Sequence, residues 1–289
     1  MKKFIFLALT IIITACNSKE KKVENSIEKT AANEVVKETN TELYGSWVGD
    51  FIPEEQNNPE EFSPTNKINI ILKKITPDQV IGQSVVAGNN RPLIGTLTQN
   101  GNTFSFSLKE PGDHKYDGSF AFTIANDTLT GTWTANDKKL NVTKRSFKLT
   151  KKQFVYDPKL MLPDEEEYID WYNPKTVQVT DEEETYPEDY YRQASENITI
   201  LNASTQKLSD NDLKNLKKLD LEIIRNTIYA RHGYTFKKKS IRQFFDPVEW
   251  YIPVSENVDN ELTALEKENI VSLKRFEKYA EDNYDTFGR

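Results

Sequence analysis

The chain from Tyr44 to Phe154 alternates apolar and polar residues with a period of two, which is typical of β-strands. Turn-forming pairs such as Asn100-Gly101 and Asn126-Asp127 separate the alternating runs. The pattern predicts about eight strands joined by short loops, and we expect them to close into an antiparallel barrel, because closure leaves no exposed strand edge. The clearest inward-facing runs are Ile68, Ile70 and Leu72; Phe104, Phe106 and Leu108; Phe120, Phe122 and Ile124; and Leu129, Gly131 and Trp133.

From Lys207 onward, apolar residues recur at helical spacing. One predicted helix, with Asp220 as a candidate cap, ends near Gly233, a residue suited to a left-handed C-terminal position. The apolar face of this helix consists of Leu221, Ile224 and Ile228. We therefore expect a small, mainly α-helical domain at residues 207–289.

Three further signals mark helix ends in this domain. Asp246-Pro247 predicts the start of a helix, because proline fits the first helical turn. Thr263 followed by Glu266 predicts a capping box at the start of the last helix. The inward stripe of that helix includes Asn269, and a buried asparagine needs hydrogen-bond partners. We expect Asn269 to bond a neighbouring loop.

An acidic segment, residues 155–206, separates the two patterns. Residues 157–196 hold thirteen acidic side chains against three basic ones. Aromatic residues are interleaved with the acids, whereas disordered chains are poor in aromatics. We expect an irregular connector that its rings pin to one of the domains. These rings are Tyr168, Trp171, Tyr172, Tyr186, Tyr190 and Tyr191.

The N-terminus has the order of parts found in a signal peptide. Lys2 and Lys3 precede an apolar run from Phe4 to Ile13, which is too short to span a bilayer comfortably. The segment Ile13-Thr14-Ala15-Cys16 resembles the lipobox of bacterial lipoproteins. The resemblance implies removal of residues 1–15 and attachment of a diacylglyceryl group, with fatty acids such as palmitate, to Cys16.

Residues 16–43 are polar and low in aromatics, which predicts a disordered tether between the lipid and the folded body. Ser18-Lys19-Glu20 resembles the short charged signals that direct lipoproteins to the cell surface in Bacteroidota. We expect an extracytoplasmic protein anchored to a bacterial membrane by its lipid. The outer membrane is favoured, with the cell surface as one option.

Charge and cysteine content exclude several classes of protein. The net charge is −7, and removal of Lys2 and Lys3 with the signal peptide lowers it to −9, which does not suit a nucleic-acid-binding protein. The single cysteine, Cys16, leaves none for disulfides or thiol catalysis. The sequence leaves the oligomeric state open.

The string Tyr229-Ala230-Arg231-His232-Gly233 resembles the core of the YARHG domain, a presumed extracellular module of bacterial envelope proteins without an assigned activity. The resemblance extends to Phe244-Phe245, to Trp250-Tyr251-Ile252-Pro253 and to Glu268-Asn269-Ile270. It covers about 80 residues and implies a domain boundary and a location, but no mechanism.

Six residues around this string are candidates for binding an anion, a glycan or a protein of the envelope: Arg225, Tyr229, Arg231, His232, Trp250 and Tyr251. A guanidinium group can donate two parallel hydrogen bonds to one anion, and aromatic rings often form the walls of such sites. This interpretation expects an exposed groove lined by Arg231, Trp250 and Tyr251. The structural alternative, which we favour, pairs a half-buried Arg225 with a carboxylate such as Asp246 or Glu249. It bonds His232 to a backbone carbonyl.

The barrel offers a second candidate function. Gly45-Ser46-Trp47 resembles the start of lipocalin-like barrels, which implies a carrier of a small apolar ligand. An eight-stranded barrel has just enough room for packed side chains or one ligand, and the many large rings favour a packed core. The polar loop from Gly88 to Pro92 is either part of the barrel mouth or simply a turn.

Catalysis has little support. The two histidines, His114 and His232, fall in different predicted domains, and no nucleophile, phosphate-binding or metalloprotease signature is present. We assign no catalytic residues, no metal and no cofactor. An envelope hydrolase is the last of three alternatives, after a binding or scaffolding protein and a carrier.

The sequence thus predicts an α+β chain with two domains. Its predicted parts are a signal peptide (1–15), a lipidated tether (16–43), a β-barrel-like domain (44–154), a connector (155–206) and a helical domain (207–289).

Overall fold

The structure, a computed structural model, describes residues 37–181 and 184–283. Residues Lys37–Arg289 form one compact unit. The predicted signal peptide, Cys16 and most of the predicted tether lie outside the described residues. None of the described helices is long and apolar enough to cross a membrane.

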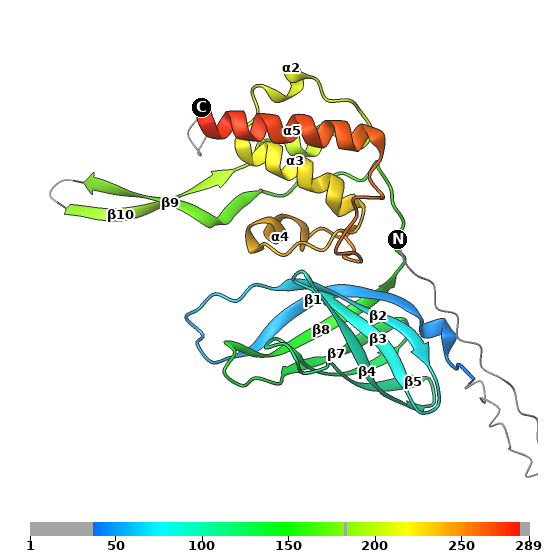
Figure 1. The fold of residues 1–289 in the computed structure, drawn as a ribbon. Helices are drawn as coiled ribbons and strands as arrows, with labels where there is room; N and C mark the ends of the chain where they lie inside the picture. The colour runs from blue at the N-terminus through cyan, green and yellow to red at the C-terminus, as the bar shows by residue number, and fades with distance from the viewer. Residues whose placement is uncertain (1–36, 182–183, 284–289) are drawn as a thin grey trace, which may run out of the picture. The chain divides into compact units, whose positions relative to one another are not determined.

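Eight antiparallel strands form a closed barrel (Figure 1), as the alternation predicts. The chain runs up and down in sequence order, and β1 pairs with both β2 and β8 to close the barrel. The strands are β1 (Gly45–Gln56), β2 (Asn66–Ile75), β3 (Val80–Val86), β4 (Asn89–Asn100), β5 (Thr103–Lys109), β6 (Gly118–Ala125), β7 (Thr128–Ala135) and β8 (Val142–Lys152).

Alternate side chains of each strand point into the barrel and form its core. Ile68, Leu108 and Leu129 are fully buried, and the rings of Phe106 and Phe122 stack with centroids 4.7 Å apart. The barrel interior is therefore filled with side chains over much of its length, as expected for a packed core.

A short segment before β1 completes the base of the barrel. Residues Thr41–Leu43 form a 3₁₀ turn, and the backbone carbonyl of Leu43 accepts a hydrogen bond of 3.0 Å from Trp47 Nε1. The backbone N–H of Thr39 donates to Ile75 O at 2.9 Å. The barrel domain therefore includes a few residues before the predicted start at Tyr44.

The connector contains a two-stranded ribbon, so the expected irregular structure is wrong for this part. Strands β9 (Ile169–Asp181) and β10 (Glu184–Gln193) pair with each other and with no other described strand (Figure 1). Most of their side chains are exposed. Because neither face is buried, the ribbon lacks the apolar–polar alternation from which strands are recognised, although β-branched and aromatic residues are frequent in it.

The base of the ribbon is fixed by a buried carboxylate. Asp170 accepts hydrogen bonds from Arg192 at 2.5 Å and from Gln243 Nε2 at 2.9 Å. Burial opposes ionisation of Asp170, but the bonds from Arg192, Asn173 and Gln243 outweigh it and lower its pKa. One expected ring anchor is present, since Tyr168 is buried and its ring lies 6.4 Å from that of Phe244 in a tilted arrangement.

The C-terminal part is helical, as predicted. Helices α3 and α5 pack against each other over a continuous apolar core (Figure 1). The elements are α1 (Asn197–Ile200), α2 (Asp210–Leu213), α3 (Lys218–Arg231), α4 (Lys239–Phe245) and α5 (Ala264–Asn283).

Several predicted helix ends can be compared with the structure. The capping box of Thr263 and Glu266 is confirmed by bonds from Thr263 N to Glu266 Oε2 (2.9 Å) and from Glu266 N to Thr263 Oγ1 (3.2 Å). Asp246-Pro247 does not start a helix, because Asp246 instead closes the C-terminus of α4. Asp220 lies inside the first turn of α3 and accepts from Lys217 N at 3.1 Å.

Hydrogen bonds join the barrel to the helical part within the compact unit. Lys67 Nζ donates to Val248 O, and Asn69 Nδ2 donates to Pro253 O at 3.0 Å. Gly88, in the turn between β3 and β4, lies directly against Lys237.

Candidate functional site

A cavity of about 700 Å³ opens at one end of the barrel. In an up-and-down barrel every second connection reaches the same end, and the loops after β1, β3, β5 and β7 all line this cavity. Side chains from the start of α4 complete its wall. We call it the mouth cavity.

The inner wall of the mouth cavity is aromatic. Phe51, Phe120 and Trp133 line it and are almost fully buried, with the Phe51 and Trp133 rings edge to face at 5.8 Å. The packed core described above therefore ends in a ring-lined surface that the cavity reaches. Pockets of a few hundred Å³ with apolar walls and a few polar groups are the usual sites for small ligands.

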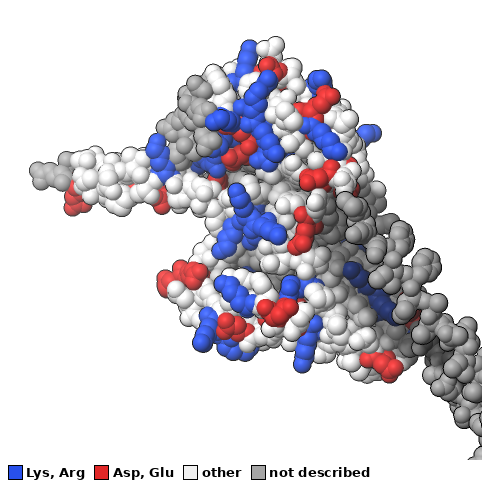
Figure 2. Space-filling model, in the orientation of Figure 1, with Lys and Arg blue, Asp and Glu red and all other residues white. Residues whose placement is uncertain are grey.

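Among the charged residues that line the mouth cavity, basic ones outnumber acidic ones, in a chain whose net charge is −7. Its basic residues are Arg91, Lys115, Lys139, Arg145, Lys237, Lys239 and Arg242, and its acidic residues are Glu61, Glu110 and Asp117. Lysine and arginine side chains also gather over α4 on the face that Figure 2 shows.

Arg91 supports the loop between β5 and β6. Its guanidinium donates to both carboxylate oxygens of Asp117 at 2.9 and 2.8 Å and also pairs with Asp113. Burial opposes ionisation of Asp117, but bonds from Arg91 and from the backbone of Gly112 and His114 outweigh it and lower its pKa. Of the predicted polar loop from Gly88 to Pro92, only Gly88 lies in the turn, and Asn89 and Arg91, which line the barrel mouth, belong to β4.

Arg145 is different because its partners are uncharged. It is 9% exposed, and its Nη1 donates to Phe51 O at 2.7 Å and to Pro64 O at 3.0 Å. Its guanidinium carbon lies 5.2 Å from the centroid of the Phe51 ring. Burial and the positive charge of Arg242 lower the pKa of Arg145 to about 10.

The residues predicted from the C-terminal string form a second cluster, at the end of α3. Gly233 has φ +71°, and a Cβ there would lie 2.5 Å from Val254 Cγ2. Glycine is therefore required both by the left-handed backbone and by the close approach of the next segment. The turn places Arg231 and His232 inward.

Arg231 is 2% exposed and is bound entirely by groups of this chain. Its Nε donates to Leu160 O at 2.7 Å, and its Nη1 donates to Ser204 Oγ at 3.0 Å. Burial lowers its pKa to about 10. Arg231 thereby fixes the linker that follows β8 onto α3.

His232 pairs with a carboxylate, not with the expected backbone carbonyl. Its Nε2 lies 2.9 Å from Glu266 Oε2, and its ring stacks on Tyr156 at 4.2 Å. Tyr156 donates to the other oxygen of Glu266 at 3.0 Å. Burial opposes ionisation of Glu266, but bonds from His232, Ser204 and the Thr263 backbone outweigh it and lower its pKa to about 2. We call Tyr156, Ser204, Arg231, His232 and Glu266 the motif network.

Arg225 is half-buried, as expected, but its partner is Glu277. Its Nε and Nη2 donate to the two carboxylate oxygens at 2.5 and 3.1 Å, so Asp246 and Glu249 were the wrong candidates. Tyr251 is buried and donates to Tyr234 O at 2.6 Å. Trp250 Nε1 donates to Met161 O at 2.7 Å.

Residues 196–278 match the YARHG domain. The matched range begins with α1, before the predicted boundary at residue 207, and includes every C-terminal candidate residue. The mouth cavity is therefore lined by the barrel and by α4 of the YARHG domain. No curated protein and no solved structure matches the chain.

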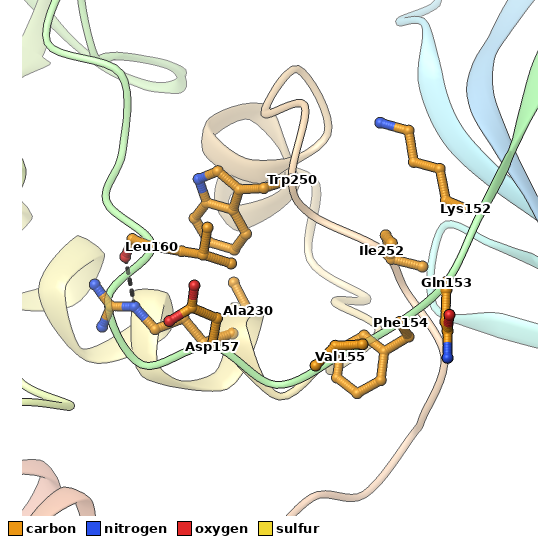
Figure 3. A pocket seen from close by; sticks show the side chains of 10 residues that line it. Lys152, Gln153, Phe154, Val155, Asp157, Leu160, Ala230, Trp250 and Ile252 are labelled. Atoms are coloured by element: carbon orange, nitrogen blue, oxygen red, sulfur yellow. Dashed lines mark hydrogen bonds between the residues drawn. The ribbon is translucent and has the colours of Figure 1, made fainter.

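The six candidate residues of the YARHG domain do not share one groove. Arg231 and Trp250 line a cavity of about 450 Å³ next to the linker after β8, where Trp250 stands beside Leu160, and Ile252 lies toward Gln153 and Phe154 (Figure 3). Arg225 and Tyr229 line a different one, and His232 and Tyr251 line neither. Arg231 and Tyr251 are buried, so they do not line an exposed groove. A ligand role for the six residues stays a prediction.

Among the described residues, no group of three or more His, Cys, Asp or Glu side chains is placed to hold a metal ion. His114 lies on the rim of the mouth cavity, 5.6 Å from the Tyr116 ring, and His232 lies in the buried motif network. Sequence reasoning missed Arg145 and Arg242, because no local pattern distinguishes them from other basic surface residues.

Proposed function

We propose that this chain is a lipid-anchored, non-enzymatic binding protein of the bacterial envelope. Its binding site is the mouth cavity, and the YARHG domain has the structural role of completing the wall of that cavity. The anchor is supported by the sequence alone, through the apolar run, the lipobox-like segment and Cys16.

The observation that carries the proposed binding role is the ring-lined mouth cavity itself. The rings of Phe51, Phe120 and Trp133 form its inner wall, and a cavity with apolar walls and a few polar groups is the usual site for a small ligand. This geometry favours the carrier-like alternative over a contact surface on the motif network, whose side chains already bond one another.

A titration with a neutral apolar probe tests the proposal. N-phenyl-1-naphthylamine fluoresces on leaving water, and we expect saturable binding to residues 37–289, which form one compact unit. Val86 lines the cavity and is partly buried, so Val86→Phe should fill part of the space and weaken probe binding by about tenfold.

The matched control is Val271→Phe, which makes the same change at a side chain that is 69% exposed on α5. This variant should bind the probe as the unaltered chain does. Equal affinity of all three proteins, or no saturable binding, would remove the mouth cavity as the binding site.

A further inference from the structure

We propose that the mouth cavity selects anionic amphiphiles, molecules with one negatively charged head group and an apolar body. The head group binds the guanidinium groups of Arg145 and Arg242, and the apolar body packs on the rings. This inference rests on the proposed function and adds the chemical class of the ligand.

Arg145 carries a buried positive charge at the inner end of the mouth cavity. Among the described residues, no carboxylate lies within salt-bridge distance of it, and its hydrogen bonds go to two backbone carbonyls. A buried charge without a counter-ion is costly, so an anion from solution would be stabilised beside it. The lowered pKa of Arg145 agrees with this lack of a partner.

Arg242 lines the same cavity as Arg145. Its charge contributes to lowering the pKa of Arg145, which means that the two guanidinium groups repel each other. Its Nη1 donates to Lys237 O at 2.7 Å, its Nε lies 3.5 Å from the Asp246 carboxylate, and its Nη2 makes a 3.4 Å contact with Asn66 Oδ1. An anion between the two arginines would relieve their repulsion and gain charge-assisted hydrogen bonds.

Of the three acidic residues of the cavity, Glu61 is exposed in the loop after β1, and the other two already have hydrogen-bond donors. Asp117 is occupied by Arg91 and by backbone N–H groups. Glu110 is buried and accepts from Ser84 Oγ and Gly118 N, both at 2.7 Å, and burial raises its pKa. Both carboxylates therefore already have donors, and exposed Lys115 and Lys239 add positive charge at the rim.

The ligand must also have an apolar part, because the guanidinium of Arg145 lies directly beside the aromatic inner wall of the cavity. Arg145 lies over the face of Phe51, which in turn contacts Trp133 and Phe120. A small inorganic anion would leave most of the cavity of about 700 Å³ unfilled. A polyanion would need a basic track along the surface, which suits neither a cavity nor a chain with a net charge of −7.

Two probes with the same ring system separate this inference from the proposed function. N-phenyl-1-naphthylamine is neutral, and 8-anilino-1-naphthalenesulfonate has the same rings and a sulfonate. We expect residues 37–289 to bind the sulfonate at least about tenfold more tightly, because charge-assisted bonds exceed neutral contacts. Arg145→Gln should remove this preference, because the affinity for the sulfonate should fall by about tenfold more than the affinity for the neutral probe.

Arg145→Gln also weakens contacts to Phe51 and Pro64, so a second variant removes only rim charge. Lys115→Gln with Lys239→Gln alters exposed side chains and should reduce sulfonate binding severalfold without changing the melting temperature. The matched control is Lys144→Gln, on β8 and outside the cavity lining, which should leave both affinities unchanged.

The outcomes are distinguishable. Binding of both probes with equal affinity, or a sulfonate preference that persists in Arg145→Gln and in the double variant, would refute anion selection while the binding role stands. Failure of both probes to bind would refute the binding role and the inference together.

Discussion

Glu266 joins the linker after the barrel to two helices of the YARHG domain. Its carboxylate accepts from Tyr156, pairs with His232 and caps α5 through Thr263, and it is fully buried. A single buried charge with this many donors is stabilising only while all of them remain in place. The geometry around Glu266 is therefore explained by the needs of the fold and is not evidence of catalysis.

Replacing Glu266 with glutamine should lower the free energy of unfolding by about 3 kcal/mol, because His232 and Tyr156 lose a charged partner in the interior. Urea denaturation followed by circular dichroism measures the change. Glu268→Gln is the control, since Glu268 is exposed and its bridge to Lys207 is also exposed, which makes its contribution small.

The same residue predicts a pH dependence. The folded-state pKa of Glu266 is depressed to about 2 from an ordinary value of 4.5, so its stabilisation is present above about pH 4.5 and is lost as the pH falls toward 2. The stability difference between the unaltered chain and Glu266→Gln should shrink over that interval. A difference that stays constant from pH 5 to pH 2 (about the span of both values) would contradict the assignment.

At the scale of elements, the turn between β3 and β4 positions the barrel against α4. Gly88 has φ +80°, and a Cβ there would lie 2.7 Å from Lys237 Cα. Gly101, in the turn between β4 and β5, has φ +58°, and a Cβ at that position would have nothing within 4 Å. The two glycines therefore share a left-handed backbone conformation, but only Gly88 is packed against another segment of the chain.

Gly101→Ala should therefore cost only the left-handed strain, about 1 kcal/mol. Gly88→Ala should cost more, because it adds a clash with the backbone at the start of α4. It should also weaken binding of the anionic probe, since Lys239 and Arg242 would shift. Equal melting temperatures for the two variants would show that the contact between Gly88 and Lys237 does not matter.

The elements that could be predicted from the sequence are those with one buried face. The strands of the barrel and the stripe of α5 follow this rule, and Asn269 bonds the loop before α2 as expected, accepting from Leu208 N at 3.0 Å and donating to Ala203 O at 2.7 Å. The ribbon was missed because it buries neither face. The prediction that Asp246-Pro247 starts a helix was wrong because such a pair can equally follow the end of a helix, here α4.

The mouth cavity could not be predicted, because its key side chains meet only through the tertiary fold. Phe51, Arg91, Arg145 and Arg242 lie on β1, β4, β8 and α4. Periodicity places each residue on its own element, but the register of a closed barrel decides which of them converge. The partner of Arg225 was mistaken for the same reason, since Glu277 lies on α5 and faces it across the helix pair.

For the whole molecule, the proposed lipid anchor makes a separate prediction. Cys16→Ala should abolish incorporation of an alkyne-labelled palmitate and release the protein from the membrane fraction, because Cys16 is the only cysteine. Ser18→Ala, two residues away, is the control and should retain the label. Labelling that survives Cys16→Ala would place the lipid elsewhere or exclude it.

Among the described strands, β9 and β10 pair only with each other, which has a consequence if the proposed lipid anchor holds the protein at a surface. Copies anchored in one membrane would diffuse in a single plane and collide often. An open strand edge is a template on which another chain can add a strand. Pro187 lacks the N–H that such joining needs, and Glu184, Glu188 and Asp189 on the same strand repel an identical neighbour. The acidity of this segment would thus keep crowded copies apart and each barrel mouth open to its surroundings.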